Sequence, residues 1–160
     1  MQDFLVDFRT TIEEAAQRLR AVPEAQASRL MNGGWSAQQI LGHLIDSAAN
    51  NHQRFVRAQF TDHLDFPSYD QEQWVLAQHY QAEPWPRLLD LWLAYNRHLA
   101  HVVSGIAPEA LSRPRARHSL DRIAWHTVPA DQPATLEYLI RDYLGHLKDH
   151  LRQLYTALDI

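Results

Sequence analysis

Residues 135–158 read TLEYLIRDYLGHLKDHLRQLYTAL, and their apolar side chains recur at every third or fourth position. This spacing places them on one face of an α-helix, which has 3.6 residues per turn. Thr135 precedes the first apolar position and can cap the helix. The stretch therefore predicts a long amphipathic helix with a broad apolar face, which is made by Leu136, Ile140, Tyr143, Leu147, Leu151, Leu154 and Leu158.

Three other stretches have the same periodicity. Residues 3–22 carry one apolar stripe, which ends before Pro23. Ser36 and Gln39 have the spacing of a capping box, so a second helix is expected from there to about residue 60. A third is expected from the prolines at 84 and 86 to Gly105, because proline suits a helix start and glycine a helix end. Four such helices predict an all-α fold, a four-helix bundle.

Length and composition fit one bundle. The length of 160 residues fits one ordinary domain, so a single domain over 1–160 is expected. The hydrophobic content of 46% is typical of a globular protein, and only five glycines argue against a turn-rich all-β protein. The chain begins with acidic residues, not a positively charged leader, and lacks an apolar run long enough to cross a membrane. The net charge of −4 gives little attraction to a phosphate backbone. We expect a cytoplasmic protein that binds neither membrane nor nucleic acid.

Two connections between the expected helices are unusually long. One covers residues 61–83, and the other covers residues 107–134, where four prolines leave no room for a regular helix. Loops of this length inside a compact domain are commonly functional. We expect both to cap one end of the bundle.

Cysteine is absent, whereas histidine occurs ten times. Any metal must therefore use imidazole and oxygen ligands, and any thiol chemistry needs a thiol from outside the chain. His146 and His150 lie one turn apart at the edge of an apolar face, where both rings can reach one metal ion. The alternative is a hydrogen bond for each half-buried ring. Asp142, one turn earlier, can orient His146 or pair with Arg141 or Lys148.

Polar residues also occur on the second and third expected helices. A stripe on the second helix is formed by His43, Ser47, Asn50 and Arg54. It is either a solvated surface or the wall of a polar pocket that faces the histidine pair, and periodicity does not separate the two. Asn96 falls within the apolar face of the third helix and needs a partner there, as a pocket residue or as a structural hydrogen bonder.

Several other kinds of site lack their motifs. No Glu-x-x-His occurs on an expected helix, which excludes the carboxylate-bridged di-iron bundle, and His-Glu-x-x-His is also absent. There is no glycine-rich phosphate loop and no Gly-x-Ser-x-Gly turn. Nucleotide binding and the usual serine hydrolase arrangement therefore have no support.

Two motifs together resemble the DinB/YfiT-like superfamily. They are GWSAQQILGHLID at residues 34–46 and YLGHLKDH at residues 143–150. The resemblance spans nearly the whole chain and implies a four-helix bundle, often dimeric, that binds one divalent metal. By position, the implied ligands are His43, His146 and His150. Imidazole ligands suit zinc or nickel first, with iron or copper as alternatives.

The resemblance leaves the reaction open, because characterised relatives use small thiols such as bacillithiol or mycothiol while most members have no assigned reaction. We expect a metal-dependent enzyme, a small-thiol S-transferase or a hydrolase, that acts on a small-molecule electrophile, and we expect a homodimer. A second hypothesis is a non-catalytic bundle that senses or stores a metal or small ligand. A third is a metal-free dimerisation module, which predicts that His43 lies far from His146. The expected pocket residues are Ser47, Asn50, Arg54, Tyr69 and Asn96.

Overall fold

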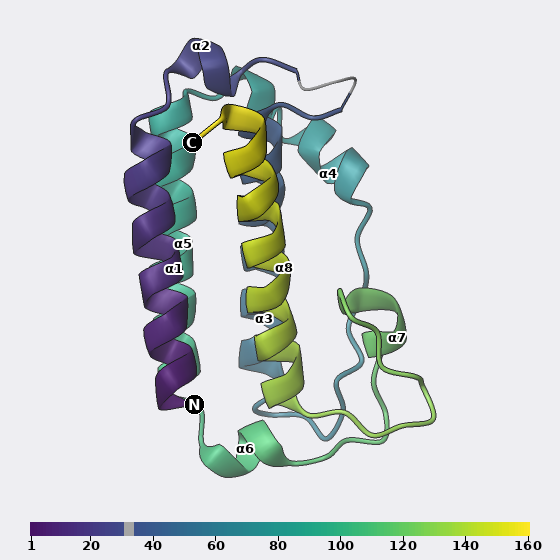
Figure 1. Ribbon diagram of the computed structural model, residues 1–160. Coiled ribbons are helices and arrows are strands. Elements are labelled where there is room, and N and C mark those ends of the chain that lie inside the picture. Colours follow the sequence, from purple (N-terminus) through teal and green to yellow (C-terminus); the bar gives the residue numbers. More distant parts are fainter. Residues whose placement is uncertain (31–33) are drawn as a thin grey trace.

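The computed structural model describes residues 1–30 and 34–160. Four long helices form the bundle: α1 (Gln2–Arg20), α3 (Ala37–Arg57), α5 (Trp85–Ser104) and α8 (Leu136–Leu158) (Figure 1). The predicted all-α class and the four helices are thus confirmed, and the described residues contain no strand beyond isolated bridges. The short elements are α2 (Glu24–Ala27), α4 (Gln71–Ala77), the 3-10 helix η1 (Tyr80–Ala82), α6 (Pro108–Ser112) and α7 (Leu120–Ile123).

The predicted helix starts are present as local hydrogen bonds. The Ser36 hydroxyl accepts from the Gln39 amide, and the Gln39 side chain accepts from the Ser36 amide, so the capping box is complete. Thr135 accepts from the Tyr138 amide at the start of α8. These bonds satisfy amide groups that have no partner inside their own helix, and they fix where each helix begins.

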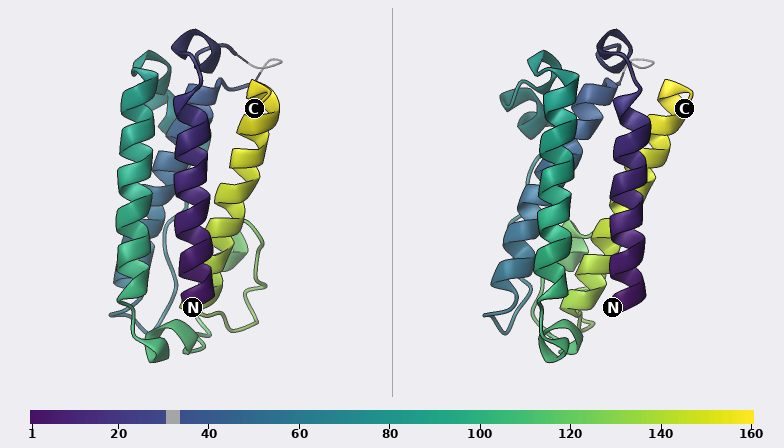
Figure 2. Two further views of the ribbon diagram at one scale, coloured as in Figure 1. Left: turned by 60° about the vertical axis from the view of Figure 1, so that its left-hand side comes forward. Right: turned by 90° about the vertical axis from the view of Figure 1, so that its left-hand side faces the viewer.

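The four long helices lie side by side but do not alternate in direction (Figure 2). Lys148 pairs with Asp7 and Arg18 lies over the ring of Tyr155, so α8 runs parallel to α1. The ring centroids of His52 on α3 and His98 on α5 are 5.1 Å apart. Near the start of α3, the Gln38 side chain donates to the carbonyl of Glu83, just before α5. Helices α3 and α5 are therefore also parallel.

This parallel arrangement explains the first long connection. A helix of 21 residues is roughly 30 Å long, so the chain must return that distance before a parallel neighbour can begin. Residues 61–83 make this return along the flank of α3 and carry α4 and η1 with them (Figure 1). The connection therefore runs along the side of the bundle and is not confined to one end of it.

The second connection contains two short helices, and the expectation of no regular helix over 107–134 was wrong. Pro108 occupies the first turn of α6, where proline favours a helix because no amide hydrogen is needed there. Helix α6 lies across the end of the bundle where α5 stops and α8 starts (Figure 1). The buried guanidinium of Arg115 donates to the carbonyls of Ala58 and Ala110, which ties the connection to the end of α3.

The apolar faces meet in one core between the four helices. Phe8, Phe55 and Trp92 are fully buried there, and Tyr143 packs edge-on against both phenylalanines. Among the described residues, no helix is both long and apolar enough to span a membrane.

Candidate metal centre

Three imidazoles from two helices meet on one side of the bundle. His43 projects from α3, and His146 and His150 project from successive turns of α8. One nitrogen of each ring lies within 4.8 Å of a nitrogen of the other two, and the Nε2 atoms of His43 and His146 are 3.3 Å apart. His43 is 2% exposed, so it does not lie on a solvated face, and the metal-free dimerisation hypothesis is wrong in placing it far from His146.

The spacing of these nitrogens suits a divalent metal ion. Nitrogen ligands about 2.0–2.1 Å from a tetrahedral zinc ion are roughly 3.3 Å apart, which is the separation found between His43 and His146. A hydrogen bond could join the rings of His43 and His146, and His150 has one of its own with Gln153, but these bonds do not explain why the third ring lies against the other two. The ring centroids of all three lie 4.5 to 5.3 Å apart, so the three nitrogens fit a single ion better than a single hydrogen bond.

Burial keeps the rings neutral. Burial, with a smaller contribution from the neighbouring histidines, lowers the pKa of His43 to about 4 and that of His146 to about 3. The pKa of His150 is also lowered, mainly by burial. At neutral pH each ring therefore has a free lone pair on one nitrogen, which is the form that binds metals.

One ring has a clear orienting partner. His150 Nδ1 lies 3.1 Å from Gln153 Oε1, and an amide oxygen can only accept, so Nδ1 carries the hydrogen and Nε2 is free for a ligand role. Sequence reasoning missed Gln153, although its i+3 spacing from His150 was an available signal. His43 Nδ1 has no partner among the described residues, and the Trp35 ring lies beside His43 with centroids 5.5 Å apart.

A pocket of about 240 Å³ opens beside the histidines. His43 and His146 line it together with three of the expected pocket residues, Ser47, Arg54 and Tyr69. Asn51, not Asn50, is the asparagine in its wall. The connections contribute Ser68, Gln71, Arg122, Ile123, Ala124 and Trp125, and α8 contributes Leu139, Asp142 and Tyr143.

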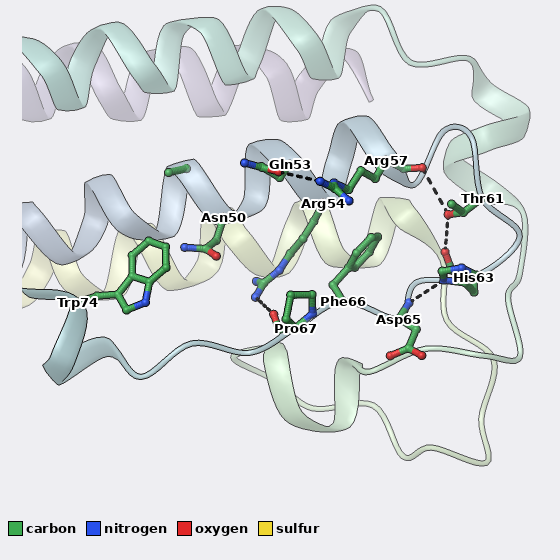
Figure 3. A pocket seen from close by; sticks show the side chains of 11 residues that line it. Asn50, Gln53, Arg54, Arg57, Thr61, His63, Asp65, Phe66, Pro67 and Trp74 are labelled. Carbon is green, nitrogen blue, oxygen red and sulfur yellow. Dashed lines mark hydrogen bonds between the residues drawn. The ribbon is translucent and has the colours of Figure 1, made fainter.

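The other two expected pocket residues lie elsewhere. Asn50 lines a separate pocket of about 410 Å³, next to residues 61–67 and Trp74 (Figure 3). Asn96 is fully buried in the core, where it donates to the Trp92 carbonyl and accepts from the Tyr143 hydroxyl. Of its two expected roles, Asn96 has that of a structural hydrogen bonder.

Asp142 has a role that neither sequence alternative included. Its two carboxylate oxygens accept the backbone amides of Trp125 and His126, each at 2.8 Å. Arg141 pairs instead with Glu137, and Lys148 with Asp7. Both roles predicted for Asp142 from the sequence were wrong, because the amides that it binds belong to a distant loop. The spacing of residues along α8 does not indicate where that loop lies. Asp142 therefore holds the loop that forms one wall of the pocket.

Replacing Asp142 with alanine should release this loop without removing a metal ligand. The substitution leaves two loop amides without their charged acceptor, a type of hydrogen bond that contributes about 1.5–3 kcal/mol. We expect faster hydrogen exchange over residues 120–128 and an unchanged metal content. Mass spectrometry measures this exchange in the wild type and in Asp142→Ala, with Glu137→Ala as a control on the same helix. If both variants exchanged as the wild type does, this role of Asp142 would be contradicted.

The metal-free protein should lose stability on acidification. Unfolded histidine titrates near pH 6.5, whereas the folded pKa values of His43 and His146 are about 4 and about 3. Between these values the unfolded chain binds protons that the folded chain does not, so this contribution is present above pH 6.5 and is lost as the pH falls. At pH 5 the loss is about 2 kcal/mol per ring.

Urea unfolding at pH 7 and pH 5, after removal of metal, measures this loss. The variant His146→Gln keeps a polar side chain but cannot titrate. Its free energy of unfolding should therefore fall less between pH 7 and pH 5 than that of the wild type, by about the contribution of one ring. Equal losses in both proteins would show that His146 is not held neutral by the fold.

Comparisons with known proteins agree with this fold. The family model of the DinB superfamily matches residues 7–154. Among solved structures, the chain is similar to YfiT from Bacillus subtilis, described as a probable metal-dependent hydrolase with an unusual four-helix bundle topology. The two share 17% sequence identity, with a TM-score of 0.73 over 99% of this chain and 90% of the other. Comparison with curated proteins gives no significant match.

Proposed function

The chain belongs to the DinB superfamily, and we propose that it is a divalent-metal-dependent enzyme that acts on a small-molecule electrophile. His43, His146 and His150 would hold the ion. The observation that carries this proposal is the convergence of three neutral imidazoles at the edge of a pocket. Within the described part of the chain, no fourth histidine, aspartate or glutamate joins the cluster, which leaves room for a substrate or water, as in catalytic sites.

The residues around the ion have distinct tasks under this proposal. When bound, a divalent ion would act as a Lewis acid, which lowers the pKa of a coordinating water or thiol and polarises an oxygen of the substrate. Gln153 fixes the orientation of His150 through the hydrogen on Nδ1. Burial raises the pKa of Tyr69 to about 12, so its hydroxyl stays protonated and can donate to the substrate. Ser47, one turn from His43, supplies a second hydroxyl.

Two reactions fit this arrangement, hydrolysis and the transfer of a small external thiol. The description of YfiT as a probable metal-dependent hydrolase supports hydrolysis. The absence of cysteine means that a thiol would have to enter as a co-substrate. The non-catalytic alternative would favour a sealed site, whereas His146 and His150 are only half-buried and the pocket is open. Zinc or nickel would suit the site first, as the imidazole ligands suggest.

The experiment is a comparison of electrophile consumption with and without a small thiol. Metal-loaded wild type would be mixed with panels of esters, amides and epoxides, in the presence or absence of glutathione as the test thiol. Turnover that needs the metal alone indicates hydrolysis, and turnover that also needs thiol indicates transfer. An absence of metal-dependent turnover across all panels, despite a full metal content, would favour the non-catalytic alternative.

We also propose a homodimer located in the cytoplasm. The family resemblance supports the dimer, as do several exposed apolar side chains, with Phe60 83% exposed and Leu91 49% exposed. Sedimentation equilibrium on the purified protein tests the dimer, because a single species of monomer mass at micromolar concentrations would contradict it.

A further inference from the structure

Arg54 is a buried cation in the wall of the histidine pocket. It is 6% exposed and lies on the same face of α3 as His43, Ser47 and Asn51. This face leads from the histidine cluster along the pocket to the guanidinium. The same side chain also lines the neighbouring pocket of about 410 Å³, where it reaches from α3 toward Pro67 (Figure 3).

The guanidinium has only neutral partners in the fold. It donates to the Pro67 carbonyl at 3.0 Å and to Asn51 Oδ1 at 3.4 Å. Among residues 1–30 and 34–160, it has no carboxylate within the 4.0 Å of an ion pair, although most other arginines near the connections have one. Two neutral oxygens satisfy at most part of a group with five N–H donors. A buried charge is costly unless it is paired, so this arrangement suggests a missing anion.

The other charges of the pocket do not neutralise Arg54. Both oxygens of Asp142 are engaged by the amides of Trp125 and His126. Tyr69 stays protonated because burial raises its pKa. Arg122, the other arginine of the pocket, is itself paired at 3.8 Å with Asp65 and with Asp121. In the adjoining pocket, Asp65 is paired with Arg117 at 2.9 Å.

We infer that Arg54 binds a carboxylate of the substrate, whose reactive end lies at His43 and His146. A guanidinium presents paired N–H donors that match the two oxygens of a carboxylate. The substrate class is therefore a short carboxylic acid, and its length is limited by a pocket of about 240 Å³. This inference rests on the proposed function, because it places the reactive end of the substrate at the metal ligands.

A series of bifunctional probes tests the inference by binding, without any need for turnover. Monohydroxamates of malonic, succinic, glutaric and adipic acid carry a metal-binding group at one end and a carboxylate at the other. The matched neutral probes carry a primary amide in place of the carboxylate. Isothermal titration of the zinc-loaded protein gives the affinity of each pair. For the chain length that spans the pocket, the acid should bind roughly 10- to 100-fold more tightly than its amide.

Three variants assign this preference to Arg54. Arg54→Met removes the charge, keeps most of the side-chain volume and should abolish the preference, whereas Arg54→Lys should retain part of it. Arg54→Met should fold, because no carboxylate loses its partner. Arg57→Met is the matched control: it lies one turn further along α3 and lines only the larger of the two pockets. It should leave the preference unchanged.

The possible results distinguish a failure of the Arg54 role from a failure of the proposed metal-dependent function. Equal binding of acid and amide at every length would overturn the role of Arg54 while leaving the metal site in place. A preference that survives in Arg54→Met, or that Arg57→Met abolishes, would place the carboxylate elsewhere and also overturn it. If no hydroxamate bound to zinc-loaded protein, the metal-dependent function itself would fail, and the inference would fail with it.

Discussion

Replacing His150 with alanine is expected to lower the affinity for zinc by more than about 100-fold. Loss of a residue that only orients a ligand lowers the metal affinity by about 10- to 100-fold, and loss of a ligand itself should exceed this. The substitution removes one of three imidazoles that lie within 4.8 Å of one another. Gln153→Leu should give a smaller loss of about 10-fold, since it removes only the acceptor for His150 Nδ1. Competition with a chromophoric zinc chelator measures both affinities.

The control for this prediction is His98→Ala, which removes an exposed histidine from α5 that is outside the cluster. It should bind zinc as the wild type does. An affinity of His150→Ala equal to that of His98→Ala would show that His150 is not a ligand.

Gly42 is expected to be the position where the smallest substitution has the largest effect on stability. A Cβ at this position would lie 2.1 Å from a ring carbon of Tyr80, far inside van der Waals contact. The ring is buried and its hydroxyl donates to Asp46 Oδ1 at 2.7 Å, so it cannot move without breaking that bond. Overpacking and the lost hydrogen bond together give a destabilisation of about 3 kcal/mol or more for Gly42→Ala.

Gly105→Ala is the matched control, because a Cβ there would meet nothing closer than 3.7 Å and the backbone φ is −95°. Its effect should be near zero or slightly stabilising. Urea unfolding of both variants measures the difference. The effect of Gly42→Ala should also shrink in a Tyr80→Ala background, where the ring is gone. Equal effects at Gly42 and Gly105 would contradict this packing of η1 on α3.

The long helices could be predicted from the sequence because their signals are local. The apolar spacing within residues 135–158 and the pair Ser36 and Gln39 need no knowledge of distant contacts. Likewise, His146 and His150 could be paired from their spacing alone. The link to His43 needed the family resemblance, because contacts between α3 and α8 join residues about a hundred positions apart.

The features that could not be predicted depend on tertiary contacts. Asp142 binds amides in a loop 16 and 17 residues away, and nothing in its local spacing indicates this. Asn51 lines the pocket in place of Asn50 because neighbouring residues on a helix differ by about 100° in direction, and the exact rotation of α3 depends on its packing. The parallel direction of α3 and α5 follows from the path of residues 61–83, whose short helices lack a strong periodicity.

The most direct test of a metal site at His43, His146 and His150 is the metal content of the protein itself. The protein would be purified without a polyhistidine tag and without chelators, and elemental analysis would be made on wild type and His146→Ala. We expect close to one equivalent of a divalent metal in the wild type and almost none in the variant. No metal in either protein, even after reconstitution with zinc and nickel at neutral pH, would contradict the metal-dependent function.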